Sequence, residues 1–171
     1  MTWSDLLKAE IESTYNATRG LFQLCEGNKL DWKPATGKNW MTLGQVLMHC
    51  TNACGFCCKG FVTGDWGPMP GGNDAEAMLP PAEKLPTIKS VAEAIKLLDL
   101  DKDMALKSIA EATEKRLESE RSTPPWGGPE YTLGQHLLHM IGHLAIHRAQ
   151  LYYYLKLMGK DVNTHHMWGM V

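Results

Sequence analysis

The chain of 171 residues is long enough to form one domain with a sizeable hydrophobic core. Hydrophobic residues make up 44% of it and charged residues 21%, which is typical of a globular protein. The net charge of −2 and the dispersed lysines and arginines give no reason to expect nucleic acid or an anionic membrane as a partner.

The N-terminus and the hydropathy predict a soluble, cytoplasmic protein that forms a single domain over residues 1–171. The opening residues MTWSDLLKAE carry acids early and lack the apolar core of a signal peptide. No apolar run approaches the roughly 20 residues that a membrane span needs. The five cysteines are an odd number, and in a cytoplasmic protein they are expected to be thiols and not disulfides.

Two helices are predicted in the first third of the chain. The first is capped by Ser4, keeps an apolar period of 3.6 residues, and ends at Gly27. The second begins at Thr42 and extends to about residue 63. Gly55 and Gly60 either weaken this second helix locally or let another helix come close to it.

Two segments rich in proline and glycine interrupt the helical pattern. Residues 64–86 contain five prolines and four glycines and cannot form a regular element. A connection of this length suits a crossover along a bundle or a lid near a pocket. The second segment covers residues 121–131. Because loops on a rigid scaffold often determine specificity, we expect both segments to do so here.

Two further helices are predicted in the second half. One begins after Ser90, which forms a capping box with Glu93, and frays near Glu120. The other covers residues 132–158 and ends at Gly159, and an irregular tail follows it. No strand is predicted. Four amphipathic helices with one long crossover between the second and third indicate an all-α fold, a four-helix bundle.

A short motif occurs twice, ninety residues apart. Residues 42–49 read TLGQVLMH and residues 132–139 read TLGQHLLH, so six of the eight positions are identical. Each copy opens with Thr-x-x-Gln, a capping box that begins a helix. Each copy therefore places a histidine, His49 or His139, about two turns into a helix.

The second copy continues into a series of histidines. His139, His143 and His147 recur every fourth residue, so they lie along one slowly drifting stripe of a helix. Either neighbouring pair can bind one metal ion, and His49 can supply a third ligand from another helix. Three protein ligands leave a coordination position open, as in catalytic sites. The alternative is a buried polar core of hydrogen-bonded imidazoles.

These residues carry a family resemblance. His49 in a TLGQxLxH helix, followed by His143-x-x-x-His147-Arg148-x-Gln150, resembles the DinB-like (DinB/YfiT) superfamily of proposed metalloenzymes. The resemblance implies a bundle with up-down-down-up topology and a divalent zinc or nickel ion on His49, His143 and His147. It places His139 beside or above them. Ala149 stands where the family commonly has glycine, a small replacement that should not disturb metal binding.

The resemblance also implies a function. Characterised relatives include transferases that use a low-molecular-weight thiol, so a thiol-dependent transferase or a hydrolase with a small-molecule substrate is expected. A homodimer is also implied. Gln150 is expected to orient a ligand imidazole or the substrate. Two alternatives stay open at this point, a non-catalytic, metal-stabilised stress-response module and a redox protein based on Cys54-x-x-Cys57. His165 and His166 in the tail carry no prediction.

Overall fold

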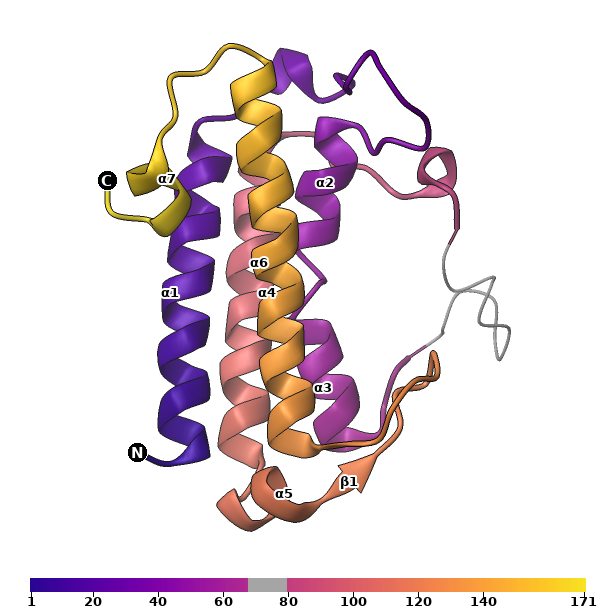
Figure 1. Ribbon diagram of the computed structural model, residues 1–171, viewed down its shortest axis with the longest axis vertical. Helices are drawn as coiled ribbons and strands as arrows, with labels where there is room; N and C mark the ends of the chain where they lie inside the picture. Colours follow the sequence, from indigo (N-terminus) through magenta and orange to yellow (C-terminus); the bar gives the residue numbers. More distant parts are fainter. Residues whose placement is uncertain (68–79) are drawn as a thin grey trace.

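A computed structural model describes residues 1–67 and 80–171, and most of this part of the chain is helical (Figure 1). The helices are α1 (Trp3–Gln23), α2 (Leu43–Cys50), α3 (Gly55–Thr63), α4 (Val91–Glu111), α5 (Glu114–Ser119), α6 (Leu133–Leu157) and α7 (Thr164–Trp168). Short 3₁₀ turns, η1 and η2, cover Gly27–Lys29 and Ala82–Lys84. The prediction of a mainly helical fold is confirmed.

Three long helices and a pair of shorter ones enclose the core. Helix α1 packs against α4 and α6, while α2 and α3 follow one another along the opposite side of α6 (Figure 1). Helices α1, α2, α4 and α6 contribute fully buried leucines, and each such side chain stabilises the fold by about 1.5–3 kcal/mol, while α3 contributes the buried Cys58. Examples are Leu7, Leu47, Leu98 and Leu144. The apolar periodicity read from the sequence is the inward face of these helices.

Both predicted Thr-x-x-Gln capping boxes are present. The Thr42 hydroxyl accepts from the backbone N–H of Gln45 at 3.2 Å, and the Gln45 side-chain oxygen accepts from the N–H of Thr42 at 2.8 Å. Thr132 and Gln135 repeat the arrangement at 3.3 and 2.9 Å. The predicted end of the last helix is also confirmed, because Gly159 follows α6 with a φ of 82°.

The single helix predicted over residues 42–63 is wrong, because it is two helices separated by a break at residues 51–54. Asp101 of α4, which is 4% exposed, accepts hydrogen bonds at 2.9 Å from the N–H groups of both Gly55 and Phe56. It also accepts one from the Tyr15 hydroxyl at 2.6 Å. The first N–H groups of a helix lack partners within it, so this carboxylate stabilises a new helix start.

Gly55 lets α4 come this close. A Cβ atom at Gly55 would lie 1.9 Å from the backbone oxygen of Asp101. Of the two roles expected for this glycine, the structure therefore supports the close approach of another helix. The break leaves the backbone carbonyl of Ala53 outside any helix, and that carbonyl becomes part of the site described below.

Four smaller expectations also differ from the structure. The cap of α1 is Thr2, paired with Asp5, and not Ser4. The third predicted helix breaks after Glu111, and α5 begins beyond Thr113. The tail is not irregular, because α7 forms there. Two residues on each side, β1 (Arg121–Ser122) and β2 (Tyr131–Thr132), form an antiparallel ladder that is too short to show a strand pattern. Residues 68–79 of the long connection lie outside the described residues.

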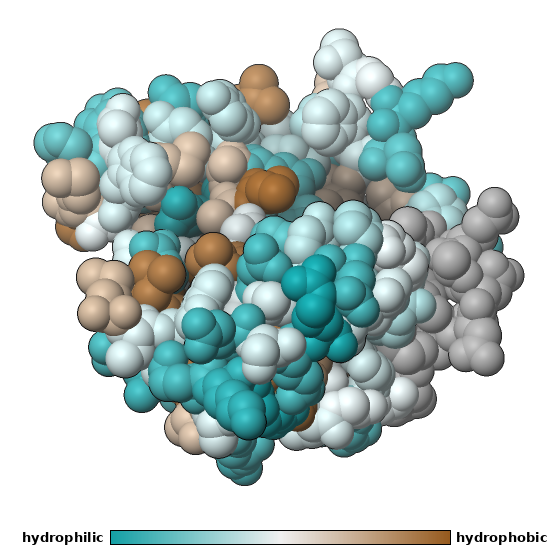
Figure 2. All heavy atoms as spheres, turned by 60° about the horizontal axis from the view of Figure 1, so that its bottom comes forward, coloured by the Kyte–Doolittle hydropathy of each residue, from teal (hydrophilic) through white to brown (hydrophobic). Residues whose placement is uncertain are grey.

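The surface carries no extended apolar face on the side seen in Figure 2. Apolar side chains appear there as separate brown spots among hydrophilic ones. Among the described residues, no helix combines the length and the apolar character needed to cross a membrane.

Candidate metal centre

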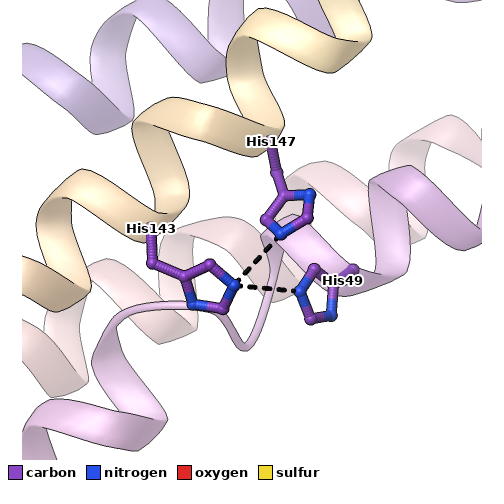
Figure 3. Close-up of side chains that lie close together, drawn as sticks. All are labelled: His49, His143 and His147. Atoms are coloured by element: carbon purple, nitrogen blue, oxygen red, sulfur yellow. Dashed lines mark hydrogen bonds between the residues drawn. The ribbon is translucent and has the colours of Figure 1, made fainter. Parts of the chain in front are cut away.

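Three of the predicted histidines meet between α2 and α6 (Figure 3). His49 lies in the last turn of α2, and His143 and His147 lie one turn apart on the facing side of α6. The Nε2 atom of His143 is 3.3 Å from Nε2 of His49 and 3.0 Å from Nε2 of His147. Candidate ligand atoms of the three residues all lie within 4.8 Å of one another.

His139 does not join this group. It is exposed, and its ring lies edge-on to Tyr131 with 4.7 Å between the ring centroids. The reason is helical drift. Each four-residue step turns about 400°, so the two steps from His147 to His139 rotate the side chain by about 80°. The expected position of His139 beside or above the other three is therefore not what the structure shows.

Gln150 sets the orientation of His147. The Tyr154 hydroxyl donates to the carbonyl of Met41 at 2.8 Å, so it accepts from the side-chain amide of Gln150 at 3.4 Å. The Gln150 oxygen then faces Nδ1 of His147 at 3.0 Å. Nδ1 must donate that hydrogen bond, which leaves Nε2 of neutral His147 without a proton and with a lone pair aimed at the other imidazoles.

His143 is oriented by the break between α2 and α3. Its Nδ1 lies 3.1 Å from the backbone carbonyl of Ala53, which can only accept. The Nε2 atom of neutral His143 is therefore also unprotonated and faces the centre. Sequence reasoning missed Ala53, because a backbone carbonyl carries no signal in the residue type and the break itself was not predicted.

Two Nε2 lone pairs 3.0 Å apart repel each other unless a cation lies between them. A proton is disfavoured in this role, because burial lowers the pKa of His143 and of His147. Burial also lowers the pKa of His49 to about 4, and the two neighbouring imidazoles contribute to that shift. A divalent ion with bonds of about 2.0–2.1 Å places adjacent nitrogens roughly 3.0–3.4 Å apart. The Nε2 separations of 3.0 Å between His143 and His147 and 3.3 Å between His143 and His49 fit such an ion.

Comparison with known proteins identifies the family. The model of the DinB superfamily matches residues 10–151. This chain belongs to the DinB superfamily. The fold also resembles the crystal structure of a candidate member of the DinB family from Exiguobacterium sibiricum 255-15, with 22% identity and a TM-score of 0.67. That match covers 97% of this chain and 98% of the other. No curated protein matches the chain.

A cavity of about 380 Å³ opens onto the histidines of this DinB-superfamily chain. His49 and His143 line it together with residues of α2, α3 and the segment 80–86. Its volume is within the range of about 300–1,000 Å³ found for small-molecule sites. A larger hollow of about 500 Å³ between α3 and α4 contains no histidine or cysteine among its described lining residues. The smaller cavity is therefore the one that adjoins the candidate metal ligands.

Cys54, at the start of α3, and Cys57 within it are both free thiols. Cys54 is fully buried, and its Sγ lies 3.9 Å from that of Cys58. Cys57 lines the cavity, but burial raises the pKa of its thiol to about 12, with further contributions from Asp101 and Cys54. A neutral thiol is a poor nucleophile. Cys54 packs in the core, and the redox alternative stays an untested prediction.

The remaining polar residues of α6 and the tail face elsewhere. Arg148 is 7% exposed, and its guanidinium lies 5.7 Å from the ring centroid of Trp168 on α7. His136 is buried against Phe61 with 4.1 Å between ring centroids. On α7, neither His165 nor His166 belongs to the group of three, and His166 bonds to the cap of its own helix.

Proposed function

We propose that the protein binds a divalent transition metal ion, zinc or nickel, through Nε2 of His49, His143 and His147. The observation that supports this is the convergence of the three Nε2 atoms, those of His143 and His147 being fixed by a hydrogen bond on the far side of the ring. Such outer partners orient imidazoles in metal sites generally. Imidazole ligation also disfavours magnesium and calcium, which prefer oxygen ligands.

We further propose that the site is catalytic and belongs to a metal-dependent transferase or hydrolase. A bound divalent ion supplies a Lewis acid that lowers the pKa of a water or thiol at an open position toward neutrality. Three protein ligands leave such a position, and the cavity beside His49 and His143 gives a small molecule access to it. The substrate is a small molecule, and a low-molecular-weight thiol is the co-substrate that the family resemblance favours.

The ligand assignment can be tested by metal binding. Protein purified without a metal-affinity column is stripped with a chelator and titrated with zinc, nickel and cobalt. His49→Ala and His143→Ala should each lower the affinity by at least about 100-fold, because a two-histidine remnant lacks a full set of ligands. His139→Ala is the matched control on the same helix and should bind as the parent does. Parent-like binding by His143→Ala would overturn the assignment.

A further inference from the structure

One wall of the cavity is tied to α2 by a single side chain. The segment 80–86 contains the 3₁₀ turn η2, and the amide nitrogen of Gln45 donates to the carbonyls of Ala82 and Leu85 at 2.6 and 2.9 Å. Asn39 also accepts from the N–H of Ala82 at 2.9 Å. Gln45 lies one turn before His49 and is 8% exposed.

The duplicated motif shows that this role is additional to capping. Gln45 and Gln135 occupy the same position in their two copies, and the side-chain oxygen of each closes a capping box. Gln135 is exposed, and its amide nitrogen donates no hydrogen bond to any described residue. Only Gln45 uses its second functional group, to hold the segment 80–86 beside the histidines.

The chemistry of the cavity lining is asymmetric. His49 and His143 line it with their imidazoles, and Met48, Phe56 and Leu85 add apolar surface. Lys84, which the held segment carries, is the one charged side chain among the described residues that line the cavity. None of the described lining residues carries a carboxylate. The cavity therefore combines a cation-binding centre, an apolar middle and a positive charge.

We propose that this cavity takes a small anionic molecule whose one end binds the metal, whose body is apolar, and whose negative group lies beside Lys84. Gln45 is the positioning residue that places Lys84 and Leu85 over the site. The inference rests on the proposed metal function, because the first contact is with the ion. An anion is favoured because the two charged features, a bound divalent ion and the ammonium group of Lys84, are both positive.

Two probes that share one metal-binding group and one apolar chain, and of which only one carries a terminal carboxylate, test the ligand class. Cobalt-loaded protein is titrated with the monohydroxamate of suberic acid and with the methyl ester of that compound, and binding is followed in the visible absorption of the cobalt. The acid should bind about two- to fivefold more tightly than the ester, as one exposed ion pair allows. Lys84→Gln should remove the difference, while Lys89→Gln, a change outside the cavity, should keep it.

A second pair of variants tests the tether. Gln45→Glu keeps the capping oxygen but replaces the amide donor with a second oxygen, which repels the carbonyls of Ala82 and Leu85. The segment 80–86 then loses its tether, so both probes should bind at least about threefold more weakly. Gln135→Glu makes the same change in the exposed copy and should have no effect. Cobalt affinity is measured first in each variant, so that probe binding is compared on fully loaded protein.

The outcomes separate the two proposals. If the parent does not bind cobalt, the proposed function fails and this inference fails with it. If cobalt binds but neither probe changes its spectrum, or the acid and the ester bind equally, only the ligand class is overturned. If Gln45→Glu binds both probes as the parent does, Gln45 has no positioning role.

Discussion

Replacing Gln150 with leucine should weaken metal binding without touching a ligand. Gln150→Leu removes the acceptor for Nδ1–H of His147, which now lies 3.0 Å from the Gln150 oxygen. The proton of His147 is then free to move to Nε2, where it can donate to Nε2 of His143, 3.0 Å away. That hydrogen bond stabilises the metal-free form and occupies the lone pair that the ion needs.

The size of the effect follows from the lost hydrogen bond. Leaving a buried donor unsatisfied costs about 1–3 kcal/mol, and each 1.4 kcal/mol changes a dissociation constant about tenfold. Changes in the outer shell of metal sites typically cost about 10–100-fold in affinity. We therefore expect Gln150→Leu to bind zinc about 10–100-fold more weakly than the parent does.

Competition with a chromophoric zinc chelator at neutral pH measures this affinity. Gln150→Glu keeps an acceptor at the same position and should bind within about threefold of the parent or more tightly, because a carboxylate makes the imidazole a stronger ligand. ¹⁵N NMR of the metal-free proteins should show the His147 proton on Nδ1 in the parent and on Nε2 in Gln150→Leu. An affinity for Gln150→Leu within about twofold of the parent would refute the reasoning.

Three other predictions concern the break and the pH dependence. Gly55→Ala should lower the free energy of unfolding by about 2–4 kcal/mol, because its Cβ would overlap the backbone of Asp101, whereas Gly20→Ala, with open space around it, should be neutral or stabilising in the same urea titration. Asp101→Asn should lower the free energy of unfolding by about 1–3 kcal/mol, since one oxygen cannot accept from the N–H groups of both Gly55 and Phe56. An unchanged midpoint of urea unfolding would show that the carboxylate does not maintain the break. In the metal-free protein the folded pKa of His49 is about 4 against 6.5 unfolded, so the unfolded chain binds more protons between these values and the stability should fall as the pH drops from 6.5 to 4. Chelator-treated parent should show a larger loss over this interval than His49→Ala, and equal losses would contradict the assigned shift.

The sequence predicts the parts of this fold that depend on local chemistry. Both Thr-x-x-Gln boxes begin helices, and Gly159 ends one, because capping and a positive φ are determined by a few neighbouring residues. The Thr2 cap could have been found in the same way, since Thr2 and Asp5 have the spacing of a capping box. The family resemblance correctly pointed to the DinB superfamily.

What the sequence does not predict depends on distant contacts. The stretch from His49 to Cys58 keeps an apolar helical character, and the break in it is stabilised by Asp101, more than forty residues later. The carbonyl of Ala53 and the second role of Gln45 follow from that tertiary arrangement and leave no pattern in the chain. The homodimer, the cytoplasmic location and the specific bundle topology stay predictions.

The most direct test is a crystal structure of the zinc-loaded protein with anomalous diffraction measured on both sides of the zinc absorption edge. The account predicts one strong anomalous peak between α2 and α6, about 2.0–2.1 Å from Nε2 of each of His49, His143 and His147. Nδ1 of His143 should remain on the Ala53 carbonyl and Nδ1 of His147 on Gln150. A zinc ion bound through Nδ1 of either residue, or bound elsewhere with these three imidazoles free, would contradict it.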